Sequence, residues 1–376
     1  MIRTGLLDKA HDKAGKKIRV LAAAGSSGGH IFPALSFLDA LKDKAGRADS
    51  LLILPERSIK NRIPLDGYNV KYVSVRPVSL RAGVRVFADI FDLLKGSLQS
   101  FLAVIEYRPD AVVGFGGIES VPLVMAAWLF RIKTLIHEQN VVPGRANRLL
   151  AKFADKVAVS FEESGKYFGK SGEKIFLSGN PIRKDMKRIN RPEALRFFGL
   201  EEGRFTILVM GGSQGSRRIN SSFMQAMPGL GEKINAQAVH ISGEADYAAL
   251  KKEYAGAGLK VKLFAFLKEM QYAYSVADLA ITRAGATTIA ELSAFKVPSV
   301  LVPYPFAQKH QAANAEVLRR AGCAIVIDDE DLDAGRLAGA VMGLAGGSRG
   351  LASMRSGFDC AVNRDAAVLL AEEALS

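Results

Sequence analysis

The sequence predicts an α/β protein built from two doubly wound parallel sheets. Short apolar runs that are typical of buried strands alternate with helical patterns along most of the chain, as expected when helices cover both faces of a parallel sheet. Three of these runs end in glycine-rich loops, at residues 25–30, 114–117 and 211–215, and a helical pattern follows each loop. At 376 residues the chain is long enough for two domains of about 100–200 residues each.

The charge of the chain is concentrated in its first half. The net charge is +13, with 31 Lys and Arg against 18 Asp and Glu in residues 1–190 and 20 against 20 in residues 191–376. An anionic partner of the first half is therefore expected, either a membrane face, a phosphorylated acceptor or a nucleic acid. No basic run is interleaved with stacking aromatic residues, so we expect no nucleic acid.

Cysteine use and the N-terminus predict a cytoplasmic protein. Cys323 and Cys360 have no metal-like spacing, so neither a disulfide framework nor a zinc site is expected. Residues 1–17 are basic and lack an apolar core and a cleavage site, which favours a disordered extension over a signal peptide. The longest apolar run, Val121 to Phe130, is about half the length that a bilayer requires.

The first strand, loop and helix unit begins at Ile18. The apolar run Ile18 to Ala24 ends in Gly25-Ser-Ser-Gly-Gly-His30, and Pro33 opens a helical pattern that extends to about Leu41. Glycines without Cβ atoms let backbone N–H groups approach a phosphate closely. His30 at the helix start is favoured in its neutral form and can accept a proton, although a single His is more often structural.

Residues 76–107 have two possible interpretations. Val84, Phe87, Phe91, Leu94 and Leu98 recur at helical spacing, which is typical of a helix that faces the core. Basic residues lie among or beside these apolar positions, namely Arg76, Arg81, Arg85 and Lys95. Apolar side chains ringed by Arg and Lys also suit docking to an anionic membrane, with Trp128, Arg131 and Lys133 at the border.

Two further strand ends place polar groups at the same edge of the first sheet. Ala111 to Val113 leads into Gly114-Phe-Gly-Gly-Ile-Glu-Ser120, after which Pro122 opens a helix, and Leu135 leads into His137-Glu-Gln-Asn140. The carboxyl ends of parallel strands face the ligand crevice of such a sheet. We therefore expect these residues to line a binding site.

The passage between the domains is predicted at Gly179-Asn-Pro-Ile-Arg183 and the charged run to Pro192. The predicted domains are residues 18–183 and 184–360, followed by a helix at about 361–376. Arg183 is either a surface residue or a clamp on a diphosphate.

The second half repeats the plan of the first. Apolar runs are followed by the loop Gly211-Gly-Ser-Gln-Gly-Ser216 and by Ala280-Ile-Thr-Arg-Ala-Gly285, where Gly285 allows a turn into a helix. The N–H groups at that helix start would face an anion. Glu291, about one turn into the helix, either accepts hydrogen bonds from two ribose hydroxyls or is a solvated helix residue.

Seven motifs resemble, in order, the bacterial peptidoglycan N-acetylglucosaminyltransferases, the MurG family. These are the three glycine loops, His137 to Asn140, Gly179 to Arg183, Arg283-Ala-Gly-Ala-Thr-Thr-Ile-Ala-Glu291 with Pro303-Tyr-Pro, and His310-Gln-Ala-Ala-Asn-Ala315. The resemblance extends from about Ile18 to the C-terminus. It implies the GT-B fold, in which two Rossmann-like domains face a cleft and the last helix crosses back to the first domain.

The resemblance also implies an activity and a location. The expected reaction is inverting transfer of GlcNAc from UDP-GlcNAc to the 4-hydroxyl of the MurNAc-pentapeptide of lipid I, an undecaprenyl pyrophosphate, to give lipid II for peptidoglycan synthesis. No tightly bound cofactor and no metal are expected. The enzyme would be peripheral on the cytoplasmic side of the cell membrane, at its anionic face, with cell-wall synthesis proteins as possible partners.

Individual roles follow from the same resemblance. His30 is the expected general base, the backbone of Leu267 reads uracil, and His310 and Asn314 support Gln311 at the sugar. The expected donor-binding residues are Ser27, Gly28, Gly29, Asn140, Arg183, Ser213, Leu267, Ala286, Thr287, Thr288, Glu291 and Gln311. The expected acceptor residues are Gly25, Ser26, Gly116, Gly117, Glu138 and Gln139. The expected membrane patch comprises Arg81, Val84, Arg85, Phe87, Phe91 and Lys95.

The second glycine loop departs from the family pattern. Ile118 stands where the family usually has tyrosine, and Glu119 brings a negative charge toward the presumed site for the acceptor's pyrophosphate. Three alternatives stay open, and this departure favours the first of them. They are a glycosyltransferase with another lipid acceptor such as diacylglycerol, an isomerase like the UDP-GlcNAc 2-epimerases, and a non-catalytic UDP-sugar sensor.

Overall fold

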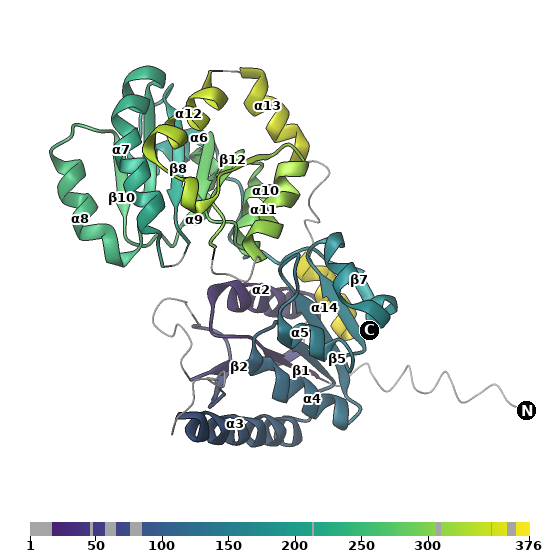
Figure 1. Cartoon of the computed structure of the whole chain (residues 1–376). Coiled ribbons are helices and arrows are strands. Elements are labelled where there is room, and N and C mark those ends of the chain that lie inside the picture. The colour runs from purple at the N-terminus through teal and green to yellow at the C-terminus, as the bar shows by residue number, and fades with distance from the viewer. Residues whose placement is uncertain are drawn as a thin grey trace, which may run out of the picture. The chain divides into compact units, whose positions relative to one another are not determined.

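The computed structural model describes residues 17–45, 48–56, 65–75, 85–212, 214–305, 310–346, 348–358 and 366–376. Arg81, Val84 and Ser213 lie outside these ranges, and the side chains of Arg85 and Phe87 are not described either. The chain forms two α/β units (Figure 1). The first comprises Met1–Gln139, Pro143–Pro181 and Asp365–Ser376, and the second comprises Asn140–Val142 and Ile182–Arg364.

Each unit contains one sheet in which every described strand pair is parallel. The first sheet has the order β3-β2-β1-β4-β5-β6-β7 and the second the order β10-β9-β8-β11-β12-β13. The strands of the first sheet are β1 (Ile18–Ala23), β2 (Ala48–Pro55), β3 (Val70–Val73), β4 (Ala111–Gly114), β5 (Lys133–Glu138), β6 (Lys156–Val159) and β7 (Ile175–Leu177). Those of the second are β8 (Phe205–Met210), β9 (Ala236–Ile241), β10 (Val261–Phe264), β11 (Leu279–Thr282), β12 (Ser299–Leu301) and β13 (Ala324–Val326). The predicted doubly wound fold is confirmed.

The strand order defines where ligands bind. In the first sheet the chain moves outward from β1 to β3 and then returns to place β4 on the other side of β1. The second sheet makes the same reversal between β8 and β11. Ligands of open α/β sheets bind at such a reversal, outside the carboxyl ends of the strands. In the first sheet a predicted glycine loop follows each of the two strands at the reversal, whereas in the second the loop Gly211 to Ser216 follows β8 and the turn at Gly285 follows β11.

The α-helices differ in detail from the predicted ranges. They are α2 (Gly28–Ala45), α3 (Arg85–Tyr107), α4 (Val121–Leu129), α5 (Arg145–Leu150), α6 (Arg191–Phe198), α7 (Arg217–Ile234), α8 (Glu244–Ala255), α9 (Met270–Val276), α10 (Ala286–Phe295), α11 (His310–Arg320), α12 (Ala334–Ala345), α13 (Ser348–Gly357) and α14 (Ala366–Leu375). Short 3₁₀ turns occur at Ile118–Ser120, Glu162–Tyr167, Gly169–Lys174 and Asp329–Asp331. The prediction that Pro33 opens the first helix is wrong, because α2 begins at Gly28 and contains Pro33. His30 therefore lies in the first helical turn.

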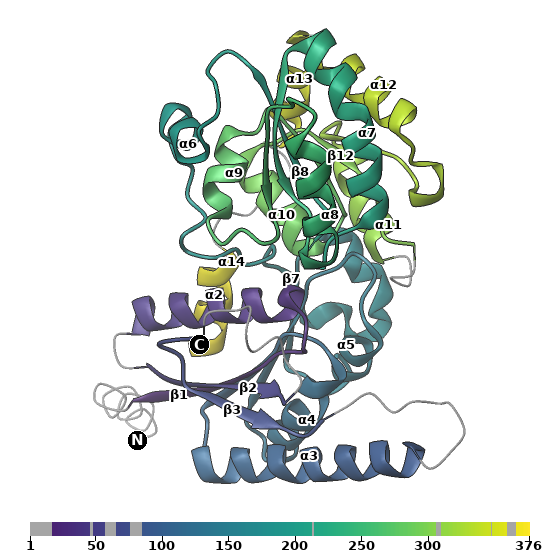
Figure 2. The same ribbon diagram turned by 90° about the vertical axis from the view of Figure 1, so that its left-hand side faces the viewer.

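Alternating strand residues divide the core of the first unit into two layers. Val20 and Ala22 of β1 pack in one apolar cluster with α2 and α14, whereas Leu21 and Ala23 pack in a second cluster on the other face of the sheet. Leu370 of α14 is fully buried in the first of these layers. The C-terminal helix thus lies beside α2, from which it is far in sequence (Figures 1 and 2).

Helix α3 covers the face opposite α2, on the outside of the first unit (Figure 2). Its residues Ala103 and Val104 are buried, but Phe91, Leu94 and Leu98 are 67%, 64% and 59% exposed. The interpretation of these three residues as core-facing is therefore wrong. None of the described helices is both long enough and apolar enough to cross a membrane.

Candidate active site

The two glycine loops of the first unit lie against each other at the β1/β4 reversal. A Cβ atom on Gly25 would lie 3.2 Å from the Cα of Gly117, and one on Gly117 would lie 2.7 Å from the Cα of Gly25. Gly116 and Gly117 have φ values of 81° and 83°, which glycine adopts at little cost. Only glycines permit the two loops to come this close. The predicted acceptor residues Gly25, Ser26, Gly116 and Gly117 therefore lie together in the structure.

His30 lies at the junction of these loops. Its Nδ1 is 3.2 Å from the Ser27 hydroxyl oxygen. A Cβ atom on Gly116 would lie 3.2 Å from its Nε2, so this nitrogen faces the second loop. In the tautomer with a proton on Nδ1, Nδ1–H donates to Ser27, and Nε2 then has the lone pair that a base requires. Ser27, Gly28 and Gly29 are in the first unit with His30, and no described contact tests their expected role toward the donor.

A buried polar network continues this site along the end of β5. The Nε2–H of His137 donates to the carbonyl of Gly179 over 3.0 Å. Burial, the largest cause, lowers the pKa of His137 to about 4, and the nearby His30 also lowers it, so His137 is neutral near pH 7. Its Nδ1 accepts from the Gln139 amide, which also donates to the carbonyl of Phe115. Gln139 thus ties the end of β5 to the loop after β4.

Glu138 has partners within the protein. Its carboxylate accepts hydrogen bonds from the N–H of Gly144, at 3.1 Å, and from the side-chain amide of Asn147, at 2.8 Å. Asn147 also lies next to Gly116, since a Cβ atom there would be 3.5 Å from its Nδ2. Asn147 was not predicted from the sequence, because it belongs to none of the motifs. It lies in the six-residue helix α5. The buried Oδ1 of Asn147 has no hydrogen-bond partner among the described residues.

In the second unit, the start of α10 combines an anion-binding geometry with a hydroxyl that has no partner within the described part of the chain. Gly285 precedes the helix, and the first turn is formed by Ala286, Thr287 and Thr288. The buried Oγ1 of Thr287 has no partner among the described residues. A phosphate at this helix start would accept from the backbone N–H groups and from this hydroxyl.

Glu291 is paired with Tyr274 rather than solvated. The Tyr274 hydroxyl donates to the Glu291 carboxylate over 2.8 Å. Burial raises the pKa of the Glu291 carboxyl to about 7, opposed by this hydrogen bond and by the nearby charge of Arg183. Tyr274 was not predicted as a site residue, because a buried aromatic residue in a helix is usually part of the core and does not by itself indicate a binding role.

Arg183 lies in the second unit, beside the loop predicted to bind uracil. It donates to the carbonyl of Lys268 over 3.2 Å, and its Nε is 3.4 Å from the Asp185 carboxylate. Leu267, which precedes Lys268, is buried. Arg183 is also near enough to Glu291 and Tyr274 for its charge to oppose the rise that burial causes in the pKa values of both. The structure thus brings Arg183, Leu267 and Glu291 together.

The residues predicted to contact the donor sugar form a second group in this unit. The side-chain oxygen of Gln311 accepts from the N–H groups of Ala284 and Tyr304, at 3.2 and 2.9 Å. Buried Asn314 donates to the side chain of Asn140 over 3.1 Å and to the carbonyl of Ala284 over 3.2 Å. Asn140, Gln311 and Asn314 are therefore held around the strand end that leads into α10.

Arg283 connects the loops of the second unit and was treated only as part of a motif in the sequence. It is 8% exposed and donates to the Ser216 hydroxyl over 2.7 Å and to the Asp329 carboxylate over 2.5 Å. It also donates to the carbonyls of Val302 and Pro303. These bonds fix the end of the Gly211 to Ser216 loop against the strand end before α10.

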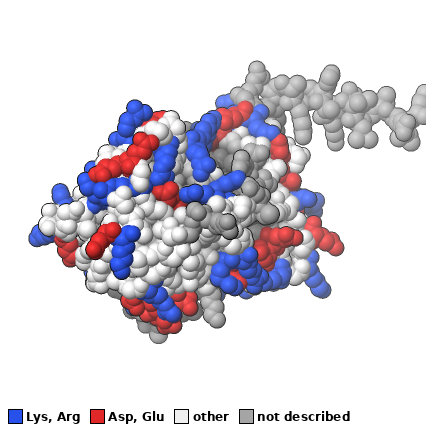
Figure 3. Space-filling model, turned by 90° about the horizontal axis from the view of Figure 1, so that it is seen from above, with Lys and Arg blue, Asp and Glu red and all other residues white. Residues whose placement is uncertain are grey.

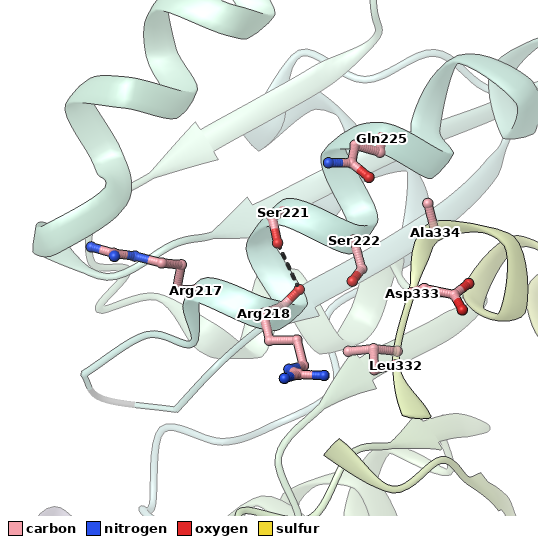
Figure 4. A pocket seen from close by; sticks show the side chains of 8 residues that line it. All are labelled: Arg217, Arg218, Ser221, Ser222, Gln225, Leu332, Asp333 and Ala334. Carbon is pink, nitrogen blue, oxygen red and sulfur yellow. Dashed lines mark hydrogen bonds between the residues drawn. The ribbon is translucent and has the colours of Figure 1, made fainter. Parts of the chain in front are cut away.

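A separate pocket of about 490 Å³ opens near the start of α7 (Figure 4). The Ser221 hydroxyl donates to the carbonyl of Arg218 there. The guanidinium of Arg218 lies 3.5 Å from Asp329 and donates to the carbonyl of Glu330, so its charge is partly compensated. The residues that line the pocket are Arg217, Arg218, Ser221, Ser222, Gln225, Leu332, Asp333 and Ala334. No predicted site residue is among them.

Comparison with known proteins decides the family. Models of the Glycosyltransferase family 28 N-terminal domain and C-terminal domain match residues 20–159 and 206–369. A UDP-N-acetylglucosamine--N-acetylmuramyl-(pentapeptide) pyrophosphoryl-undecaprenol N-acetylglucosamine transferase from Thermodesulfovibrio yellowstonii is 39% identical over 317 residues, which cover 83% of this chain and 86% of the relative. The relative of the same name from Myxococcus xanthus is 37% identical, covering 90% of this chain and 87% of its own. The chain belongs to the MurG family of glycosyltransferases.

Solved structures agree with the MurG family assignment. The crystal structure of Acinetobacter baumannii MurG superposes with a TM-score of 0.75 and 27% identity, covering 96% of this chain and 99% of that one. A putative UDP-N-acetylglucosamine 2-epimerase from Listeria monocytogenes superposes with a TM-score of 0.70 but only 13% identity, covering 96% of this chain and 97% of that one. The epimerase likeness shows the fold alone. The resemblance to the MurG family and the GT-B fold are confirmed, whereas the individual residue roles stay predictions.

Proposed function

We propose that this chain transfers GlcNAc from UDP-GlcNAc to lipid I and forms lipid II. The single observation that supports this most directly is the 33–39% identity to relatives named for that reaction, which extends across both units. Both sites described above fit the two substrates. The second unit offers a helix N-terminus, Arg183 and Glu291 for a nucleoside diphosphate sugar, and the first offers paired glycine loops and a base for a lipid diphosphate acceptor.

In the proposed mechanism, His30 Nε2 takes the proton of the MurNAc 4-hydroxyl. The hydroxyl oxygen attacks the anomeric carbon of GlcNAc from the side opposite the diphosphate, the bond from that carbon to the UDP oxygen breaks, and UDP leaves with the electron pair. Inversion gives a β1,4 linkage. The N–H groups at the start of α10 and the guanidinium of Arg183 stabilise the charge that develops on the leaving diphosphate. The contact between Nδ1 and Ser27 orients the imidazole for this step.

The substitution His30→Ala tests this assignment. Loss of a positioned general base lowers the rate of transfer by a factor on the order of 10²–10⁴. The dissociation constant of UDP-GlcNAc, measured by calorimetry, should change less than about twofold, because Arg183, Glu291 and the start of α10, which are proposed to hold its ribose and diphosphate, lie in the other unit. Turnover of His30→Ala at the native rate would remove His30 from the chemistry.

We also propose that the first unit docks on the anionic face of the membrane through an apolar face. This face consists of Phe91, Leu94 and Leu98 on α3 and of Trp128, Leu129 and Phe130 at the end of α4. All six side chains are at least 43% exposed, and the two helices meet through Phe101 and Phe130, whose rings are 5.0 Å apart. A groove of about 480 Å³ lies between the helices. Lys95 and Arg131 are exposed beside these apolar residues and suit an anionic surface.

Charged side chains of both signs lie on a part of the surface other than the apolar face of α3 and α4. On the face drawn in Figure 3, Lys and Arg side chains are interspersed with Asp and Glu, with uncharged surface between them. Charges of both signs are therefore present on that face, unlike the apolar face of α3 and α4.

A further inference from the structure

A carboxylate of the protein occupies the junction of the two glycine loops in the first unit. A Cβ atom on Gly117 would lie 2.5 Å from Oε2 of Glu119, and one on Gly25 would lie 3.3 Å from the same oxygen. Glu119 is only 8% exposed. The backbone N–H groups of Glu119 itself and of Ser26 in the first loop are near enough to favour the charged form of this carboxylate.

This position is the one that a bound anion would take. Glycine loops hold phosphates because their N–H groups converge on a space that no Cβ atom fills. In this chain the space beside Gly25 and Gly117 is filled by Oε2 of Glu119, and the N–H of Ser26 in the first loop favours the charged form of this carboxylate. Burial raises the pKa of the Glu119 carboxyl, whereas the two N–H donors lower it. Burial is the larger of these effects, and the two N–H groups that oppose it lie where a diphosphate between the loops would also meet them.

We propose that Glu119 is an internal occupant of the acceptor diphosphate site and that a lipid diphosphate must displace its carboxylate from the Ser26 N–H in order to bind. This inference rests on the proposed function, in which the glycine loops hold the acceptor. A carboxylate and a diphosphate cannot share these donors, because like charges at contact distance repel strongly where water is largely excluded. Glu119 therefore limits the affinity for the acceptor. It also selects among acceptors according to the charge of the acceptor's head group. A diphosphate provides more charge than the carboxylate it replaces, whereas the hydroxyl of a diacylglycerol has no charge with which to compete.

The test measures binding of inorganic pyrophosphate and of a soluble, short-chain lipid I analogue to the full chain. Saturating UDP, which occupies the donor site but has no sugar to transfer, is present throughout, so that no turnover occurs and pyrophosphate reports on the glycine loops alone. The variants are Glu119→Gln, which keeps the shape of the side chain and removes its charge, and Glu119→Ala, which removes both. The matched control is Glu106→Ala, which changes the net charge equally at an exposed carboxylate whose ion-pair partner is Lys71.

We expect both Glu119 variants to bind pyrophosphate and the analogue about tenfold more tightly than the native chain, since removing one unit of like charge at contact is worth at least that factor. Glu106→Ala should stay within about twofold. The dissociation constant of UDP-GlcNAc and the melting temperature should be unchanged in Glu119→Gln, which shows that the loops remain folded.

Unchanged or weaker binding in Glu119→Ala would overturn the proposal, because Glu119 would then be neutral toward the diphosphate or would help to hold it. A native chain that binds pyrophosphate but transfers no GlcNAc to the lipid I analogue would contradict the proposed function instead. The two failures are distinguishable, since binding is measured separately from transfer.

Discussion

The buried hydrogen bond between Tyr274 and Glu291 gives the donor role proposed for Glu291 a testable pH dependence. A carboxylate that accepts from two ribose hydroxyls has to be ionised, but burial raises the pKa of Glu291 to about 7 in the unliganded chain. Donor affinity should therefore depend on pH in the physiological range.

We predict that UDP-GlcNAc binds about tenfold more tightly at pH 8 than at pH 6, since protonated Glu291 has to lose its proton before it accepts both hydroxyls. The diphosphate of UDP-GlcNAc is a diester without a titration in this range, so the slope reports on the protein. Glu291→Gln should bind more weakly than the native chain and show no such slope. An equal slope in the variant, measured by calorimetry at both pH values, would contradict the role of Glu291.

The raised pKa of Glu291 also makes the stability of the folded chain depend on pH, but in the opposite direction from donor affinity. The folded chain holds the Glu291 proton up to about pH 7, whereas the unfolded chain releases it near pH 4.5. The contribution of this group to the free energy of unfolding is thus fully present below about pH 4.5 and is lost as the pH rises through 7. Bound donor and folding therefore favour different protonation states of one side chain.

At the scale of single residues, the sequence predicted the positions of functional side chains better than their partners. His30, Arg183 and Glu291 could be placed because each stands at a strand end, a domain passage or a helix start. Asn147 and Tyr274 could not, because both act through contacts that only the folded chain creates. The location of Glu119 at the loop junction follows from its packing against Gly25 and Gly117, although its charge was already evident in the sequence.

At the scale of elements, α3 decides between the two interpretations of an amphipathic pattern. Helical spacing alone cannot distinguish an apolar face that packs on a core from one that faces outward, since both produce the same periodicity. Here the later residues Ala103 and Val104 pack on the sheet, whereas Phe91, Leu94 and Leu98 remain exposed.

We predict that the double substitution Phe91→Glu and Leu94→Glu reduces binding to anionic vesicles by at least tenfold, because each buried apolar side chain contributes about 1.5–3 kcal/mol to insertion. Leu177→Glu, at an exposed leucine on β7, is the matched control and should bind like the native chain. Sedimentation with phosphatidylglycerol vesicles should also show weaker binding in high salt. Binding that is insensitive to salt, or equal in the double variant, would rule out this docking face.

The glycine-loop elements were predicted more securely than the helix boundaries. A loop of several glycines after an apolar run can form few other structures, so all three loops were located correctly at strand ends. The start of α2 was not, because Pro33 was taken as the first helical residue although a further turn precedes it. Pro33 is the sixth residue of α2 and lies beyond the first four N–H groups, which lack a helical acceptor, so α2 contains it at the loss of one backbone hydrogen bond.

At the scale of the whole chain, the repeated strand, loop and helix pattern predicted both parallel sheets. The order of the strands could not be read from periodicity, which says nothing of which strands are neighbours. It is the return of β4 to β1 and of β11 to β8 that brings pairs of loops together and creates two sites from residues distant in sequence. The acceptor was the hardest feature to predict, since Ile118 and Glu119 of the second loop depart from the family pattern.

The most direct measurement is transfer of labelled GlcNAc from UDP-GlcNAc to a soluble lipid I analogue, with parallel reactions that contain diacylglycerol or no acceptor. We expect a labelled disaccharide, linked β1,4, on the lipid I analogue. We expect no product on diacylglycerol, and no UDP-ManNAc when acceptor is absent. Product on diacylglycerol alone, or UDP-ManNAc without an acceptor, would contradict it.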